Sequence, residues 1–364
     1  MPNLNEGDQH IVDSAVRLLE ENGGVRHARE AQHARSYFKP DAWRRMADAG
    51  WLGALVDPDA GGAGLSLREA LLILEECGVR AAPEPLTLAL GSAAILSNIG
   101  DKAAKALLDG VIAGESICAP VIPGFYGNEA DRFEVRGNAV SGVSSAVFDG
   151  HAANRFLLAA NVDSEFQIWC VDRDIAGVSF DVRDTVDGGT LGYLRLNGVA
   201  HDKITKLTAG NRAQAIFDRA RDIVRLGYCA VLIGGMREAF RITLEHLKLR
   251  KQFGVPIGSF QAIQHRCADL HIDIRSAHAL LYEAGAAYGT ERQAYAAASA
   301  KARISDIVMR VMQESVQLHG AIGYTDEHDI SLYFRRSVAL SAAGGDAVAC
   351  FKDVSAFSRQ LDVD

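Results

Sequence analysis

Apolar residues recur at helical spacing over two long stretches of the chain, residues 214–248 and 260–287, and neither stretch contains proline. This period predicts two long helices, which we expect to run antiparallel. The segment between them, residues 252–259, contains two glycines and Pro256, so it predicts a sharp corner between the helices. Arg250 lies at the edge of this corner.

The apolar pattern changes twice along the chain and divides it into residues 1–114, 115–208 and 209–364. Helices are predicted in the first region at residues 6–21, 41–49, 66–77, 87–98 and 101–113. Short alternating apolar runs, separated by Gly, Asn and Asp, predict a compact β domain in the middle region. These runs lie at residues 133–135, 156–160, 166–171 and 191–196. The last region is helical again and closes with a helix at residues 347–361.

Two helix starts and one loop carry local signals. Asp41, which follows Pro40, is predicted as an N-cap, and Ser66 with Glu69 matches a capping box. The glycine-rich loop at residues 56–64 is interpreted as a turn that uses positive backbone dihedrals. It lacks the lysine and the strand context of a phosphate-binding loop, so we do not expect it to bind a nucleoside triphosphate.

Composition narrows the class of protein. The 364 residues carry a formal charge of -8, and the 38 basic residues are scattered, which argues against a nucleic-acid partner. The six cysteines show no CxxC spacing, so we expect buried free thiols in a reducing compartment and no metal site. No apolar run reaches the roughly 20 residues that a membrane-spanning helix needs, and no signal segment is evident. We expect a cytoplasmic protein.

Two motifs carry candidate chemistry. The first, residues 250–254, reads Arg-Lys-Gln-Phe-Gly, and the second, residues 317–324, reads Gln-Leu-His-Gly-Ala-Ile-Gly-Tyr. The Arg250 guanidinium could form two parallel hydrogen bonds with a pyrophosphate, and Phe253 could cover an adenine or ribose. Glycines after Gln317 would let a dinucleotide approach the backbone closely. The alternative is that Arg250 makes a surface ion pair and the glycines only end a helix.

With these motifs about 60 residues apart and joined by helical sequence, the chain resembles the acyl-CoA dehydrogenase family over nearly its whole length. These flavoproteins introduce a double bond between the α and β carbons of an acyl-CoA thioester. The resemblance implies an α+β fold with an N-terminal helical domain, a middle β-barrel or sandwich and a C-terminal four-helix bundle. It also implies a dimer of dimers that uses FAD and passes electrons to an electron-transferring flavoprotein.

The resemblance further implies site residues. The FAD of a neighbouring subunit would be bound by Arg250, Phe253, Gln261, Gln317, Gly320 and Ala321. Gln261 matches a Phe-Gln pair that often follows the corner, although a polar residue on a helix face is an equally good interpretation. Asp222 and Arg225, three residues apart on one helix face, fall where similar enzymes hold a charged pair at the acyl-CoA cleft. A solvated surface ion pair is the competing interpretation.

The departures from the family pattern concern catalysis. Desaturation needs a carboxylate that removes the α proton. Counted from Gln317 without gaps, the position of the usual glutamate is Gly344, and a second known position is Val224. In the β domain, the segments that line the flavin ring in relatives read Pro-Val-Ile-Pro-Gly at residues 120–124 and Ser-Ser-Ala-Val-Phe at residues 144–148. They lack the usual threonine and tryptophan.

Two hypotheses follow. In the first, the chain is a working enzyme whose base has moved, with Asp346 as the nearest carboxylate and Asp222 and Asp149 as further candidates. In the second, it is a catalytically silent subunit of a hetero-oligomeric acyl-CoA dehydrogenase, of the kind found in steroid side-chain degradation, and completes the FAD site of a partner. A helical scaffold without any nucleotide would require both glycine-bearing motifs to be accidental.

Overall fold

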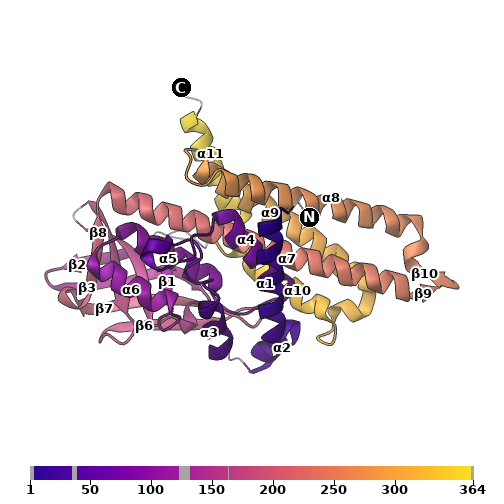
Figure 1. The fold of residues 1–364 in the computed structure, drawn as a ribbon, viewed down its shortest axis with the longest axis horizontal. Coiled ribbons are helices and arrows are strands. Elements are labelled where there is room, and N and C mark those ends of the chain that lie inside the picture. The colour runs from indigo at the N-terminus through magenta and orange to yellow at the C-terminus, as the bar shows by residue number, and fades with distance from the viewer. Residues whose placement is uncertain (1–3, 35–38, 123–131, 163, 362–364) are drawn as a thin grey trace.

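The computed structural model describes residues 4–34, 39–122, 132–162 and 164–361. Its N-terminal part is helical, as predicted, and contains α1 Glu6–Glu21, α2 Gly24–Ala34, α3 Pro40–Asp48, α4 Leu67–Val79, α5 Leu86–Ile99 and α6 Lys102–Ile112 (Figure 1). The sequence analysis missed α2. Ala28, Ala31 and His27 form the buried side of that helix. A face of alanine and histidine gives too weak an apolar period to be recognised.

The local signals had mixed outcomes. The capping box of Ser66 and Glu69 is confirmed, since each side chain bonds the backbone N–H of the other. The N-cap prediction for Asp41 was wrong: the cap is Lys39, and Pro40 occupies the first turn of α3, where its missing N–H costs nothing. The glycine-rich loop is a turn, because Gly61 has a φ of 91°.

The middle part consists of two four-stranded sheets, in agreement with the predicted β domain. One sheet has the order β1 Cys118–Val121, β4 Arg155–Val162, β5 Glu165–Asp172 and β8 Thr205–Ala209. The other has the order β2 Arg132–Arg136, β3 Ala139–Phe148, β7 Thr190–Ala200 and β6 Val178–Asp184. β1 and β4 are parallel, and the other pairs are antiparallel. The two sheets enclose a hydrophobic core of their own around Phe156, Trp169 and Leu194.

The C-terminal part contains α7 Asn211–Leu249, α8 Gln261–Ala286, α9 Gln293–His319, α10 Asp329–Ala342 and α11 Ala347–Leu361. α7, α8 and α9 extend side by side away from the sheets to one tip of the molecule (Figure 1). The predicted corner is confirmed at this tip. It is a small β-hairpin, β9 Lys251–Gln252 with β10 Val255–Pro256, followed by a short 3-10 turn into α8.

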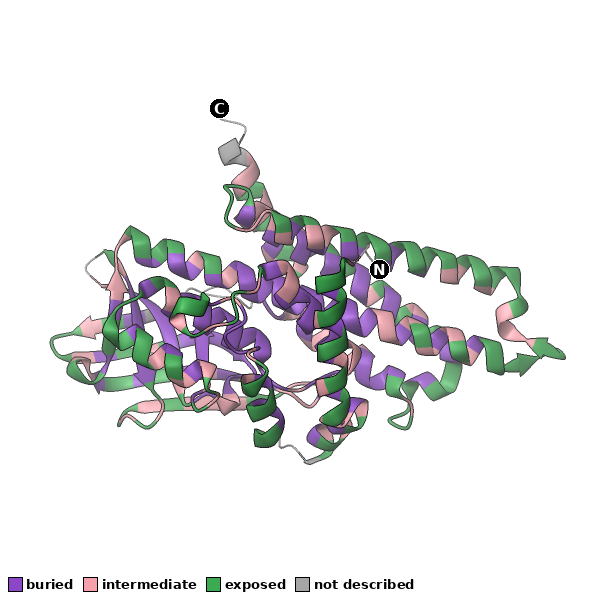
Figure 2. Ribbon diagram, in the orientation of Figure 1, coloured by how far each residue is buried: buried purple, intermediate pink, exposed green. Residues whose placement is uncertain are grey.

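The N-terminal helices share one hydrophobic core with the C-terminal bundle. α4 and α7 touch through their backbones: a Cβ added at Gly234 would lie 1.9 Å from the Glu75 carbonyl oxygen, and one at Gly78 would lie 2.1 Å from that of Val231. Figure 2 shows the middle of α7 buried, whereas the hairpin and much of α8 are exposed. Among the described residues, no helix is long and apolar enough to cross a membrane.

Candidate functional site

The two motifs meet in one open groove at the tip of the bundle. The groove has an empty volume of about 1290 Å³ and is formed by the end of α7, the hairpin, the start of α8 and the end of α9. Five of the six residues predicted to bind FAD line it: Arg250, Phe253, Gln317, Gly320 and Ala321. Residues some 60 positions apart in the chain therefore face the same space. Gln261 is exposed on the first turn of α8 and is not among the residues that line the groove.

Arg250 is available for a ligand. It is the C-cap residue of α7, where its N–H bonds the His246 carbonyl oxygen at 2.9 Å. Its guanidinium is exposed and makes no hydrogen bond or ion pair within the described part of the chain. The surface ion pair considered from the sequence is therefore absent there, and a fork of N–H donors points into a groove of suitable size for a pyrophosphate.

Phe253 has a left-handed backbone conformation, which is unfavourable for a phenylalanine. It has a φ of 51°, and Gly254 after it has a φ of 83°. Two positive φ values at the centre of a two-residue hairpin indicate a type I′ turn, which favours Asn-Gly and not an aromatic residue. The side chain is 92% exposed and has one aromatic contact, an edge-to-face pair with Phe260 at 6.2 Å. The turn thus presents an aromatic ring at the rim of the groove.

The two glycines of the second motif have different roles. Gly320 ends α9 with a φ of 69° and a ψ of -143°, which only glycine adopts readily. No atom lies within 4 Å of a Cβ added there, so its backbone is open to a ligand. A Cβ at Gly323 would lie 2.8 Å from the Val316 carbonyl oxygen. Packing within the chain accounts for Gly323, whereas Gly320 both ends the helix and exposes backbone in the groove.

Three residues of the groove with titratable side chains were not predicted from the sequence. His246, His319 and Arg266 also line it. Arg266, on α8, is paired with Glu314 of α9. His246 lies four residues before Arg250 on α7, so helical spacing could have indicated that both face one side. His319 lies within the second motif but was not given a role.

The residues predicted for the acyl-CoA cleft are engaged by their own chain. Asp222 is buried and accepts a hydrogen bond from Gln293 Nε2 at 2.9 Å, and burial raises the pKa of its carboxyl group. Arg225 is also buried and donates from Nε to the Gly344 carbonyl oxygen at 2.9 Å and from Nη2 to Asp353 Oδ2 at 2.6 Å. A solvated surface pair is therefore wrong for these two residues.

The two positions expected for the usual base, Val224 and Gly344, hold no carboxylate. Val224 is fully buried. Gly344 is buried with a φ of 83°, and its carbonyl oxygen is the one bound by Arg225. Asp346 is exposed and accepts a hydrogen bond from the Ala349 N–H at 2.7 Å, so it caps the start of α11.

The segment at residues 144–148, which lines the flavin ring in similar proteins, is hydrogen-bonded and packed within its own chain. Ser144 Oγ accepts from the Leu194 N–H at 2.9 Å, and Ser145 Oγ donates to the Ile122 carbonyl oxygen at 2.9 Å. Phe148 packs edge-to-face against Tyr228 of α7 at 6.0 Å. Within residues 120–124, Pro123 and Gly124 lie outside the described residues.

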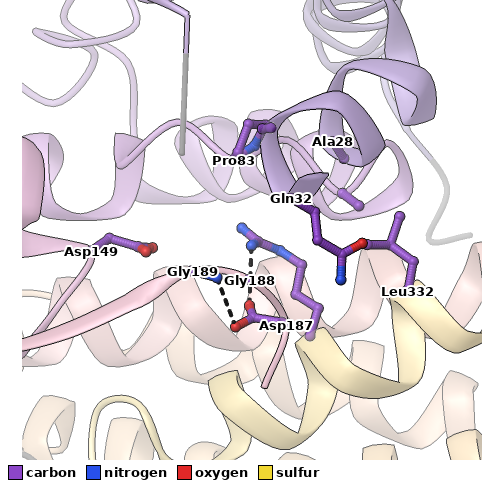
Figure 3. Close-up of a pocket in the computed structure, with 11 residues that line it drawn as sticks. Ala28, Gln32, Pro83, Asp149, Asp187, Gly188, Gly189 and Leu332 are labelled. Atoms are coloured by element: carbon purple, nitrogen blue, oxygen red, sulfur yellow. Dashed lines mark hydrogen bonds and ion pairs between the residues drawn. The ribbon is translucent and has the colours of Figure 1, made fainter. Parts of the chain in front are cut away.

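Asp149, a further candidate base, lies between two small cavities of about 20 Å³ each, both of which Arg336 also lines. Figure 3 shows Asp149 and Asp187 entering one cavity from the β domain, with Gln32 of α2 and Leu332 of α10 on its other side. Burial raises the pKa of Asp149 to about 7, against an opposing effect of Arg336. A carboxyl group with this pKa could exchange a proton near neutral pH.

These observations were compared with known proteins. The acyl-CoA dehydrogenase N-terminal domain matches residues 5–115, and the acyl-CoA dehydrogenase C-terminal domain matches residues 215–347. Acyl-CoA dehydrogenase IpdE2 of Mycolicibacterium smegmatis is 28% identical over 336 residues, which cover 92% of this chain and 93% of that protein.

Solved structures agree with this match. A variant of the steroid ACAD Tcur3481-Tcur3483 superposes with a TM-score of 0.88 at 27% identity and covers 99% of both chains. The ChsE4-ChsE5 complex from Mycobacterium tuberculosis has a TM-score of 0.85 at 23% identity, over 99% of this chain and 98% of that one, and so shows the same fold.

Proposed function

Because the chain belongs to the acyl-CoA dehydrogenase family, FAD-dependent oxidoreductases of the CH–CH bond of acyl-CoA, we propose that it is the silent subunit of a hetero-oligomeric member. In this role it lends one groove to the FAD site of a homologous partner, and the partner carries the catalytic base. One observation carries the proposal. At the groove that would hold a neighbour's FAD, Arg250 has no partner among the described residues. By contrast, Asp222 and Arg225, which would serve the chain's own acyl-CoA cleft, are hydrogen-bonded to other residues of the chain.

The groove fits part of the cofactor. Arg250 would pair with the pyrophosphate, and Phe253 would cover the adenosine. The exposed backbone at Gly320 would allow the dinucleotide to approach closely. FAD supplies the hydride acceptor for desaturation of the thioester. The residues of this chain would hold and orient the cofactor, and no step of proton removal is assigned to them.

The proposed substrate class is based on the similarity to a steroid ACAD. The similar Tcur3481-Tcur3483 protein is a steroid ACAD with two named components. We therefore assign the assembly an acyl-CoA whose acyl group is derived from a steroid, an electron-transferring flavoprotein as electron acceptor, and a dimer-of-dimers arrangement.

A second candidate is a working enzyme that uses Asp149. The buried carboxyl group and its pKa of about 7 favour it. In that case the chain would carry FAD and oxidise acyl-CoA when expressed alone. The close packing of Phe148 against Tyr228 argues for the silent subunit, because it covers the segment that would contact the flavin.

The test is flavin content. The full chain should be colourless when purified alone, and co-expression with a homologous acyl-CoA dehydrogenase subunit should give a yellow complex with absorbance near 450 nm. Arg250→Ala should lower the FAD content of the complex at least tenfold, whereas Arg241→Ala, an exposed arginine of α7 outside the groove, should not change it. Stoichiometric FAD in the isolated chain, or full FAD in the Arg250→Ala complex, would overturn the proposal.

A further inference from the structure

Three histidine rings contact one another at the groove, and the proposed function uses none of them. The ring of His319, at the end of α9, lies between those of His246 on α7 and His328 before α10. The centroid distances are 4.6 Å to His246 and 4.5 Å to His328. These rings form no metal site, because no group of His, Cys, Asp and Glu in the described ranges is arranged to hold one.

Hydrogen bonds fix the orientation of two of the rings. His319 Nδ1 lies 2.7 Å from the Ser315 carbonyl oxygen, so this nitrogen carries the proton, and its buried Nε2 has no partner in the described part of the chain. His328 Nδ1 accepts a hydrogen bond from the Ile330 N–H at 3.2 Å. His246 lines the groove at intermediate burial, and no hydrogen bond of its ring is found among the described residues.

The residues around His246 disfavour its charged form. It faces Arg250 on its own helix, Arg266 of α8 with its partner Glu314 of α9, and the rings of His319 and His328. Burial, His328 and Arg250 together lower the pKa of His246. Burial also lowers the pKa of His319 to about 4, so His246 is the more readily protonated of the two histidines that line the groove.

A pyrophosphate in the groove would reverse this balance, because it brings two negative charges next to the same ring. We infer that His246 is a second ligand of the dinucleotide pyrophosphate beside Arg250, and that the groove takes up a proton at His246 when the dinucleotide binds. This inference rests on the proposed function. Affinity should then increase as the pH falls through the pKa of the occupied site, by up to tenfold per pH unit.

The probe is ADP-ribose, which contains the adenosine and a pyrophosphate diester without a flavin and without a phosphate that titrates near neutral pH. Binding to the full chain, in the assembly in which it is purified, is measured by calorimetry at pH 6.5 and 8.0 in buffers of different ionisation enthalpy. We expect a buffer-dependent heat that reports proton uptake, and about tenfold tighter binding at pH 6.5.

Two variants distinguish proton uptake by His246 from the contact of its ring with His319. His246→Gln should remove the buffer dependence and most of the pH dependence, and His246→Phe should do the same while keeping an aromatic ring on His319. His10→Gln, at an exposed histidine of α1, is the matched control and should behave as the wild type. Arg250→Ala should abolish binding at both pH values.

Each remaining outcome is decisive. Tight binding with buffer-independent heat, or with linkage that survives His246→Gln, would overturn the inference and leave the proposed function intact. No binding of ADP-ribose by the wild type at either pH would overturn both.

Discussion

The middle of α7 is enclosed by the rest of the chain, whereas its C-terminal end is exposed. Its 39 residues span about 58 Å. In its first half, Asp222, Arg225 and Tyr228 are enclosed by neighbouring elements, and the first two are hydrogen-bonded to them. At its C-terminal end, Arg250 has no partner in the described residues and Phe253, just beyond, is almost fully exposed. Polar groups that the chain itself satisfies are not free to bind a ligand, so the function of this helix lies at its exposed end.

The exposed end also carries conformational strain. A left-handed phenylalanine costs about 1–2 kcal/mol relative to a glycine, and an exposed ring recovers none of this by burial within its own chain. Strain of this kind persists where a binding role requires it. Beside the enclosed part of α7, Gly344 has a φ of 83°, which a glycine adopts without cost. Four changes test the contrast, in order of expected effect.

Arg225→Met should have the largest effect. It would leave the Gly344 carbonyl oxygen and the Asp353 carboxylate without their partner, and we expect the free energy of unfolding to fall by about 3 kcal/mol. Chemical denaturation measures this, with Arg221→Met, a partly exposed arginine of the same helix, as control. If the variant keeps full stability but loses acyl-CoA binding, Arg225 has a binding role in the acyl-CoA cleft.

Asp149→Asn tests the buried carboxyl group. Its pKa in the folded state is raised to about 7, so the folded state favours the protonated form, and stability is lost as the pH rises through about 7. Asparagine tolerates the φ of 54° at this position. We expect the variant to be stabilised, with a gain about 2 kcal/mol larger at pH 8 than at pH 5.

Denaturation curves at the two pH values measure this gain, with the exposed Asp202→Asn as control. A gain that does not change with pH would show that Asp149 is not held in its protonated form. Loss of acyl-CoA oxidation by Asp149→Asn in the isolated chain would support the second candidate function.

Phe253→Ala should separate binding from stability. We expect FAD to bind the complex about 10- to 30-fold more weakly, a loss of about 1.4–2 kcal/mol, while the free energy of unfolding changes by less than about 0.5 kcal/mol. Phe253→Gly should lose flavin equally and raise stability by about 1 kcal/mol, because glycine relieves the strained turn. If the wild type and both variants bind FAD with equal affinity, Phe253 is not part of the FAD site.

Asp346→Ala should have the smallest effect. Loss of the N-cap of α11 should lower stability by about 1 kcal/mol, and Asp346→Ser should restore most of it. Acyl-CoA oxidation by the assembled complex should stay within about twofold, because the carboxylate binds its own backbone. A loss of 100-fold or more would identify Asp346 as the displaced base.

Much of the fold could be predicted from the sequence, because helix positions depend on a local period. The closing helix and α1 agree with the predicted ranges, whereas α2 was missed because its buried face consists of alanine and histidine. The groove was also accessible to prediction, since Arg250 and Gln317 belong to recognisable motifs. His246 was missed because its four-residue spacing from Arg250 indicates a shared helix face but not that this face lines a groove.

By itself, the sequence determined the order of helical and β regions, most of the N-terminal helices and four of the eight strands of the two large sheets. It also showed that two motifs carry an arginine, an aromatic ring and glycines, and that the usual glutamate is absent. Only the tertiary structure decided which polar groups are free. Arg225 is satisfied by Asp353, which lies 128 residues away, whereas Arg250 has no such partner among the described residues. The satisfaction of a polar group depends on residues that folding brings beside it, and no local pattern in the chain contains that information.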